Sequence, residues 1–494
     1  MERMAGVDAG YLYMETPTMH MHTLKIAVLE PSEPFTFERF LTSLSERLDG
    51  LPPMQQRVLP VPFALNHPLW IRDRPIDLRN HVFRHVLPAP GGMAELEAAI
   101  GEIASTPLDR SVPLWELHVC EGLEGGRVAS VGKMHHALAD GVAANALLVN
   151  VTDVVRQGPG TSWELERTPS RREQVTMALR DAIKQTLTLP RLLARTVRAV
   201  VAVVKHRKAS EVDVPRPVLD APRTSFNRAL TARRTYATAT LPLADIKEAR
   251  EAHPGVTLND VVLAVVAGAI RRWMDARGER VNGALVAGVP VATDQPGSPT
   301  RLGGNRVSNL FTSLATDVDD PAARLHRISE TTTASKLVQR TLGPDMLIDW
   351  VQFTPPAPFA AALKWYSRSG TASKHNPPFN VIVSNVRGPG EPVTIAGAGL
   401  ADLFSVGPIL EGIGLNVTAW SYAGRLNVSI LSCPDLVPDL APLVADLRPA
   451  LDELLPSREK RAGEGRPAGR SARQNEHEPG EVSTEHPAKP AKGA

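Results

Sequence analysis

The segment from 133 to 141 reads Lys133-Met134-His135-His136-Ala137-Leu138-Ala139-Asp140-Gly141, with two adjacent histidines followed by an aspartate and a glycine. It comes after a β-rich run, Arg127 to Met134, and before a stretch with helical periodicity, Ala143 to Val155. A turn between a strand and a helix presents side chains to a cleft. Because adjacent residues at a strand end point to opposite faces, only one histidine can serve a given cleft. The pair is therefore not expected to ligate one metal ion.

Histidine is well suited to remove a proton from a hydroxyl group near neutral pH, because its unperturbed pKa of about 6.5 leaves it largely neutral there. A lone buried histidine is usually structural. Two histidines with Asp-Gly at fixed spacing should, however, arise by chance in roughly one chain per thousand of this length. Gly141 permits a tight turn, and we expect Asp140 to orient the loop rather than attack a substrate. The segment thus predicts an active site built on one histidine base.

Length and composition limit the possible classes of protein. The 494 residues are too many for one compact core and suit two domains with additional segments. Apolar residues make up 43% and charged residues 22%, as in globular proteins. The net charge of +2 gives no global indication of nucleic-acid binding. Cys120 and Cys433, the only cysteines, lack metal-ligand spacing, which favours a reducing compartment and argues against a disulfide scaffold or structural zinc.

Targeting signals are not evident. The N-terminal residues lack the basic and then apolar pattern of a secretory signal. Uninterrupted apolar runs such as Val261 to Ile270 reach about half of the ~20 residues that cross a bilayer. We therefore expect a cytoplasmic protein, with peripheral membrane contact left open.

The pattern along the chain predicts four parts: an α/β domain over 1–156, a connector over 157–222, a second α/β domain over 223–456, and a disordered tail over 457–494. The tail has almost no large apolar side chains and cannot offset its chain entropy by burial. Predicted strands and helices are Leu24 to Leu29, Phe37 to Leu48, an extended piece from Asp77 to Val82, Met93 to Ile103, Glu116 to Val119, Leu258 to Arg277, Ala284 to Val289, Phe379 to Ser384, and a hairpin of Gly414 to Ser421 with Arg425 to Leu431.

The connector is basic and amphipathic. Its Arg171 to Lys208 segment carries about ten Lys or Arg residues against Glu173 and Asp181, and it is nearly all apolar around Val197 to Val204. We predict a helical segment interrupted once, at Pro190. Two interpretations stay open, namely a helix that lies on an anionic membrane and a helix packed between the domains with a solvated basic face.

The HHxxxDG pattern resembles the signature of coenzyme A-dependent acyltransferases related to chloramphenicol acetyltransferase, which include nonribosomal condensation domains. Flanking segments narrow the resemblance to the bacterial wax ester synthase/diacylglycerol acyltransferase family, in consistent order over about residues 5 to 455. These segments are Glu15 with Met21-His22, Pro113-Leu114-Trp115-Glu116, Asn259-Asp260-Val261-Val262-Leu263-Ala264, Gly304-Asn305-Arg306-Val307-Ser308, and Asn380 to Pro389.

The resemblance implies an α/β (α+β) fold. Two chloramphenicol-acetyltransferase-like domains would face each other across a central tunnel, joined by the helical connector, with His136 near the middle. Acyl-CoA would enter from one side and the acceptor alcohol from the other. No metal, cofactor or prosthetic group would be needed. Neither cysteine is paired with a base and no Gly-x-Ser-x-Gly elbow occurs, so we expect direct transfer without an acyl-enzyme.

In the family the second histidine of the motif is the general base, which here is His136. His135 would face the other way in a structural role. Asp140, next to Gly141, would hold the loop through a salt bridge or backbone hydrogen bonds. The remaining candidates could contact the substrate, but each could instead have only a structural role.

Among these candidates, Asn259 and Asp260 open a helix. Asn259 could help to stabilise an oxyanion or shape the tunnel, and the alternative is an ordinary N-terminal cap. Trp115 could contact the acyl chain, although packing is the stronger interpretation. Asn305, Ser384 and Asn385 could bind substrate or be turn residues.

The acceptor implied by the resemblance is a hydrophobic hydroxyl compound. We expect diacylglycerol, with long-chain alcohols accepted more weakly, because the Ala, Arg, Gly and Pro content is typical of a high-GC bacterium, where the family mostly stores triacylglycerol. The alternatives are a wax ester synthase, a condensation-type acyltransferase and a non-enzymatic lipid-droplet coat protein. The expected location is the inner membrane face or the lipid droplet surface.

Overall fold

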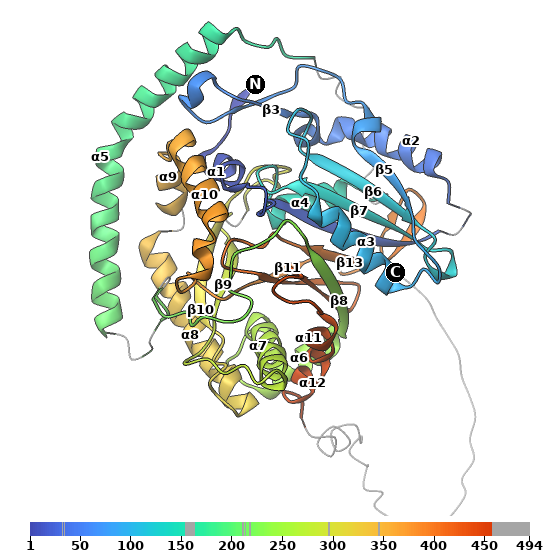
Figure 1. Cartoon of the computed structure of the whole chain (residues 1–494), viewed down its shortest axis with the longest axis vertical. Coiled ribbons are helices and arrows are strands. Elements are labelled where there is room, and N and C mark those ends of the chain that lie inside the picture. The colour runs from blue at the N-terminus through green and yellow to red at the C-terminus, as the bar shows by residue number, and fades with distance from the viewer. Residues whose placement is uncertain are drawn as a thin grey trace, which may run out of the picture. The chain divides into compact units, whose positions relative to one another are not determined.

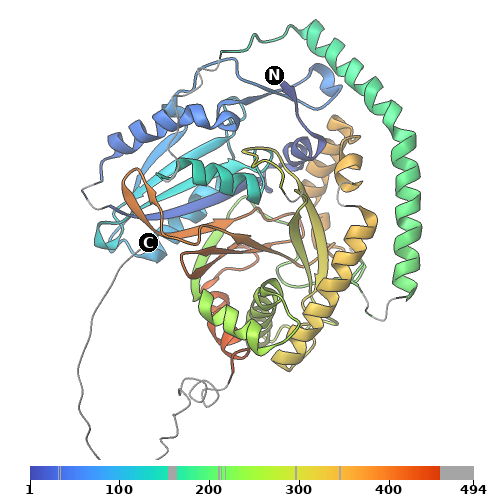
Figure 2. The same cartoon turned by 180° about the vertical axis from the view of Figure 1, so that it is seen from behind.

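Two six-stranded mixed sheets form the framework of the protein. The computed structural model describes residues 1–456 except 32, 34, 154–163, 210, 211, 213, 217, 218, 295, 296, 344 and 345. The tail predicted over 457–494, and part of the connector, lie outside these described residues. Figures 1 and 2 show the two sheets from opposite sides, with helices packed around them.

The first sheet has the strand order β12-β13-β2-β7-β6-β5. Its central strand β2 pairs antiparallel with β7 on one side and with β13 on the other. Residues 22–29 of β2 are all buried, because both faces of the strand are covered. The strands are β2 (His22–Pro31), β5 (Val82–Val86), β6 (Trp115–Glu121), β7 (Val128–His135), β12 (Thr394–Ile395) and β13 (Ala398–Val406).

The second sheet has the order β10-β9-β11-β14-β15-β8. The β14–β15 hairpin turns at Ala423-Gly424, both with positive φ. A third, small sheet consists of β1 (Glu2–Arg3), β3 (Arg57–Leu59) and β4 (Leu69–Ile71). The strands of the second sheet are β8 (Thr235–Pro242), β9 (Val286–Ala292), β10 (Val307–Ser313), β11 (Val381–Arg387), β14 (Leu415–Tyr422) and β15 (Arg425–Ser432).

Strands cross between the two halves. β12 and β13 come late in the chain but complete the first sheet, since β13 pairs with β2 from Ala398↔Pro31 to Val406↔Leu24. A domain boundary placed at one position in the sequence cannot represent strands that leave one half of the chain to pair in the other. The division into sequence domains stays a prediction, whereas the two facing lobes implied by the resemblance are the observed architecture.

The helices cover the outer faces of the sheets. α7 is buried on all sides from Asp260 to Ile270, and its buried apolar residues form the core of the second half with α6, α8, α11 and α12. The helices are α1 (Gly6–Met14), α2 (Phe37–Arg47), α3 (Met93–Ser105), α4 (Gly141–Val151), α5 (Arg171–Ala209), α6 (Leu243–Ala252), α7 (Leu258–Ala276), α8 (Pro321–Leu342), α9 (Met346–Val351), α10 (Pro356–Ser369), α11 (Ala441–Ala445) and α12 (Leu447–Asp452).

The connector helix α5 runs along the outside and contacts α8 and α9 (Figures 1 and 2). The predicted interruption at Pro190 is wrong, because α5 continues through it as one helix of 39 residues. Proline removes the bond to the carbonyl of Thr186, and both residues are exposed, so water can satisfy that carbonyl. Within the described residues, no helix combines the length and apolar character that crossing a bilayer requires.

The other predicted elements are present, with ends that differ by a few residues, and the last two residues of the helix predicted over Ala143 to Val155 lie outside the described residues. The exception is Asp77 to Val82, predicted as extended. Asp77 instead caps a short 3₁₀ turn, Leu78–Asn80, by accepting a hydrogen bond from the Arg79 N–H, and β5 begins only at Val82. The aspartate side chain offers the backbone this local alternative to a strand.

Candidate active site

The loop from 136 to 140 connects β7 to α4 and is held from both ends. Asp140 is the N-cap of α4, and its Oδ1 accepts hydrogen bonds from the N–H groups of Val142 (3.1 Å) and Ala143 (3.0 Å). Its Oδ2 accepts from the Arg301 guanidinium (2.6 Å) and the Arg306 N–H (2.8 Å). One carboxylate therefore fixes the loop and joins it to the second half of the chain.

Backbone contacts strengthen the same junction. Ala139 forms an isolated parallel bridge with Gly304, and the Gly304 N–H donates to the carbonyl of Leu138 (2.8 Å). Gly304 has a φ of 73°, which favours glycine, and this turn brings the following Asn305 beside His136.

The hydrogen bonds of Asn305 fix the protonation of His136. The Asn305 Nδ2 donates to the carboxylate of Asp8 (2.7 Å) and to the His136 carbonyl (2.8 Å). The His136 carbonyl can only accept, which fixes Nδ2 on that side, so the amide oxygen of Asn305 faces Nδ1 of His136, at 3.1 Å. That oxygen cannot donate, and Nδ1 must carry the hydrogen. The lone pair of the neutral ring is therefore on Nε2.

Burial keeps the imidazole of His136 uncharged. The ring stacks on Tyr11, with centroids 4.2 Å apart and planes 24° apart. Burial lowers the pKa of His136 to about 4, although the nearby Asp140 charge acts in the opposite direction. At neutral pH the side chain is thus an available base.

Asp8 completes a chain of three side chains, Asp8–Asn305–His136. It is 4% exposed, and burial raises its pKa to about 7 despite the hydrogen bond from Asn305. Sequence analysis missed both Asp8 and Tyr11, which lie on α1, outside any motif. An aspartate in the otherwise apolar segment Gly6–Met14 was the available signal.

His135 points away from His136. Its Nδ1 accepts from the Ala137 N–H (3.0 Å), so its Nε2 donates to Glu15 (2.8 Å). Arg110 also contacts Glu15 (2.8 Å). Burial alone would raise the pKa of Glu15, but the hydrogen bonds and charges of His135 and Arg110 lower it to about 2. His135 is 1% exposed, and its hydrogen bond connects the end of β7 to Glu15.

His136 lines a cavity of about 390 Å³ between the two halves. Gly141 and Ser384 also line it, whereas Asn385, next along β11, does not. Adjacent residues on a strand point to opposite faces, which accounts for the difference. Two polar residues that sequence analysis missed, Asn416 and Thr418 on β14, line the same cavity.

Three predicted substrate contacts lie elsewhere. Trp115 stacks on His81, donates from Nε1 to the Met54 carbonyl (2.7 Å), and lines a separate, smaller cavity. Asp260 forms a capping box with Thr257 at the start of α7. Asn259, on the same turn, does not line the cavity that contains His136.

No group of three or more metal-ligating side chains occurs in the part of the chain that the structure describes. The two cysteines are buried and do not line the central cavity. Burial raises the pKa of the Cys120 thiol to about 12. His136, by contrast, lines this cavity and has an unprotonated ring nitrogen.

Comparison with known proteins places this site in a family. The profile of the wax ester synthase/diacylglycerol acyltransferase catalytic domain matches residues 4–262, and that of the WS/DGAT C-terminal domain matches residues 303–455. The chain belongs to the wax ester synthase/diacylglycerol acyltransferase family. Two Mycobacterium tuberculosis proteins named as diacylglycerol O-acyltransferases are 37% identical over 446 residues (89% of this chain, 92% of the relative) and 34% identical over 461 residues (92% and 90%).

A solved structure supports the same assignment. The wax ester synthase/diacylglycerol acyltransferase from Marinobacter aquaeolei VT8 matches with a TM-score of 0.63 and 25% identity, over 93% of this chain and all of that one. The first condensation domain of the calcium-dependent antibiotic synthetase shares the fold, with a TM-score of 0.57 at 15% identity over 92% and 96% of the two chains. As a WS/DGAT member, the chain is an acyltransferase with the two-lobed fold that the motif predicted.

Proposed function

We propose that this enzyme transfers a long-chain acyl group from acyl-CoA to the free hydroxyl of diacylglycerol, forming triacylglycerol. The observation that carries the proposal is the unprotonated Nε2 of His136 inside a cavity lined by both halves of the chain. The relatives named as diacylglycerol O-acyltransferases support this acceptor over a simple alcohol.

The reaction needs one base and one proton transfer in each direction. Nε2 of His136 takes the hydroxyl proton while the oxygen bonds to the thioester carbonyl carbon. The tetrahedral intermediate then collapses, the C–S bond breaks, and the proton on Nε2 passes to the thiolate to give free coenzyme A. A positioned base of this kind contributes about 10²- to 10⁴-fold. The proposal involves no metal, no prosthetic group and no acyl-enzyme.

The test is a competition assay. Purified enzyme would be incubated with labelled palmitoyl-CoA and with diacylglycerol and hexadecanol together. We expect triacylglycerol in excess, with some wax ester, because apolar contacts discriminate between chains by only about 1–3 kcal/mol per missing contact. An excess of wax ester would show that long-chain alcohols, rather than diacylglycerol, are the preferred acceptor. No transfer to either acceptor would refute the proposed function.

We also propose that α5 holds the enzyme on the cytoplasmic face of an anionic membrane or lipid droplet. At 100° per residue, its exposed apolar side chains fall within an arc of about 140°. They are Leu179, Ile183, Leu187, Leu193, Val197, Val200, Val201 and Val204. Buried residues Ala178 and Leu192 face the protein instead. Five basic residues border the apolar stripe, namely Arg180, Lys184, Arg191, Arg198 and Lys205.

This arrangement is typical of a helix that lies in a membrane interface, with apolar side chains inserted and basic ones at the headgroups. Each Lys or Arg near an anionic surface adds up to about 1 kcal/mol, and salt weakens the attraction. Packing against α8 and α9 leaves the stripe exposed, so contact with the protein and contact with a membrane are compatible.

A further inference from the structure

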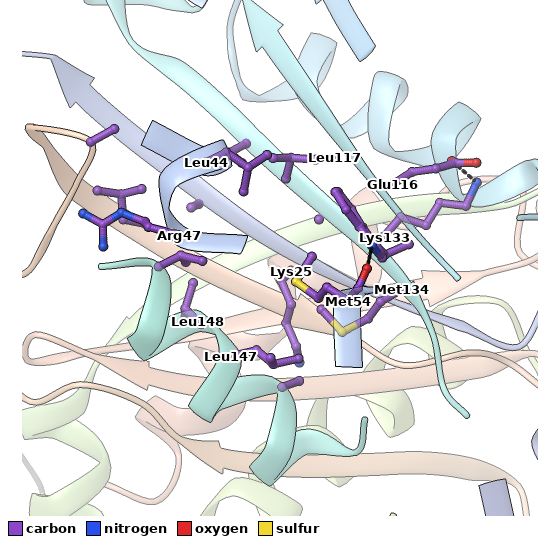
Figure 3. A pocket seen from close by; sticks show the side chains of 18 of the residues that line it. Lys25, Leu44, Arg47, Met54, Glu116, Leu117, Lys133, Met134, Leu147 and Leu148 are labelled. Atoms are coloured by element: carbon purple, nitrogen blue, oxygen red, sulfur yellow. Dashed lines mark hydrogen bonds and ion pairs between the residues drawn. The ribbon is translucent and has the colours of Figure 1, made fainter. Parts of the chain in front are cut away.

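Lys25 is a buried lysine with few partners. It lies on β2, and its Nζ donates to the hydroxyl of Ser405 (2.5 Å) and sits 4.4 Å from the ring centroid of Trp420. Burial lowers its pKa to about 7, against the opposing charge of Asp140. By contrast Lys133, on β7, faces a carboxylate, with its Nζ 2.9 Å from Glu116 (Figure 3). Of these two lysines, Lys25 lacks an anionic partner within ion-pair distance.

Lys25 lines two cavities at once. One is the 390 Å³ cavity that contains His136. The other is a cavity of about 120 Å³ whose lining is almost entirely apolar, bounded by the sheet, α2 and α4. Figure 3 shows Lys25 among the side chains of this smaller cavity, including Leu44, Leu147 and Leu148. Engineered apolar cavities of about 150 Å³ bind a six-carbon ring, so the smaller cavity can hold part of a hydrocarbon chain.

The hydrogen-bonding capacity of Lys25 is unfilled. The amine has two N–H donors when neutral and three when protonated, and one hydroxyl and an aromatic face satisfy only part of this capacity. An acceptor oxygen placed at the boundary of the two cavities would satisfy a further donor. An ester carbonyl that joins a chain in the smaller cavity to a reacting hydroxyl in the larger one has this geometry.

We propose that Lys25 binds an ester carbonyl of the diacylglycerol acceptor, whose adjoining acyl chain enters the small cavity next to α4. The inference rests on the proposed function and deepens it. A long-chain alcohol has the reacting hydroxyl but no neighbouring ester, so it gains nothing from Lys25. Lys25 is thus a specificity-determining residue that favours diacylglycerol over simple alcohols.

The first test is Lys25→Met, which keeps the length and apolar stem of the side chain and removes the donor. At pH 6, where Lys25 is mostly protonated, we expect kcat/KM for diacylglycerol to fall about 10- to 100-fold, the range for losing a hydrogen bond from a charged donor. The value for hexadecanol, measured on the same preparation, should change less than threefold. An equal change for both acceptors, or none for either, would overturn the inference.

The second test fills the small cavity with Leu148→Trp. We expect the same selective loss with diacylglycerols that carry long acyl chains and little loss with a short-chain diacylglycerol. If Leu148→Trp instead altered the preference for acyl-CoA chain length and left the acceptor ratio unchanged, the cavity would hold the donor chain and the inference would be wrong. If the wild-type enzyme used hexadecanol but no diacylglycerol, the proposed acceptor would be wrong. That result would be distinct from the failure of either variant to show a selective loss.

Discussion

His136 is held by Asn305 on one ring nitrogen and by the Tyr11 face, which leaves the other nitrogen for chemistry. We predict that His136→Ala lowers turnover by about 10²- to 10⁴-fold and leaves the fold intact, because the side chain supplies only the base and one hydrogen bond to Asn305. Rate and circular dichroism would be measured on the same sample. A variant that kept half the wild-type rate would show that another group is the base.

Asp8 accepts a hydrogen bond from Asn305, which in turn contacts His136, so we expect Asp8 to be a positioning residue. Asp8→Ala leaves a buried N–H of Asn305 without its acceptor, and we expect kcat to fall about tenfold as the amide loses its orientation. Asp8→Asn can still accept that hydrogen bond and should keep most of the activity. If the two variants lost activity equally, the charge of Asp8 rather than its acceptor oxygen would matter.

Motif spacing predicts that His136 faces a cleft and that Asp140 holds its loop, as the structure places them, but it does not predict the residues that orient His136. His136, Asp140 and Asn305 lie in motifs whose spacing can be read directly. Asp8 and Tyr11 lie on a nine-residue helix more than 120 positions earlier, and only folding brings them to His136. Asp260 shows the opposite case: it lies in a recognisable motif, but in the structure its side chain caps a helix.

At the level of elements, Asp140 combines an N-cap with an ion pair to Arg301, and its side chain is 3% exposed. Arg301 keeps its ion pair with Asp294, so we predict that Asp140→Ala lowers the unfolding free energy by about 1–3 kcal/mol, through loss of the cap and of one charged hydrogen-bond partner, and lowers the rate as well. Asp140→Asn keeps the cap and loses the charge, so its melting temperature should be intermediate. A lower rate at an unchanged melting temperature would contradict the structural role.

The apolar stripe of α5 gives a second prediction at this level. Wild-type enzyme should float with anionic liposomes at low salt and less at high salt. Ile183→Glu, in the stripe, should abolish flotation. Thr188→Glu adds the same charge at an exposed position about 140° away on the helical projection and should weaken flotation only slightly. Absence of binding at low salt, or equal loss in both variants, would exclude the proposed contact.

Local patterns predicted most elements, because hydrophobic periodicity and turn residues act over a few positions. The pairing of β13 with β2 could not be predicted in this way. Its partners lie more than 360 residues apart, and nothing within either strand specifies the other. The path of α5 through Pro190 was missed for a different reason: exposure to water makes a lost backbone bond tolerable.

For the whole molecule, buried histidines predict loss of stability in acid. Burial lowers the pKa values of His20 and His136 to about 4 and that of His22 well below 6.5. Between pH 6.5 and 4 the unfolded chain therefore binds more protons, and unfolding becomes easier as the pH falls. Asp8, whose pKa burial raises to about 7, acts in the opposite direction, but three histidines outweigh one carboxyl.

The measurement is the denaturant midpoint at pH 7 and at pH 5. We expect a lower midpoint at pH 5, and a smaller difference in His20→Gln, which cannot take up the proton. An equal or higher midpoint at pH 5 in the wild-type enzyme would contradict this prediction.

The pairing of β2 with β13 also has a consequence for how the protein is made on the ribosome. β2 can pair with β7 once residue 135 has left the ribosome. The opposite edge of β2 can pair only after β13, which ends at Val406, has been synthesised. At about 5–20 residues per second, synthesis of the intervening segment takes roughly 14 to 54 s. During that time a long apolar strand edge is unpaired, and such edges promote aggregation. Slower initiation or a chaperone that shields nascent chains should therefore raise the yield of folded enzyme more than a stronger promoter would.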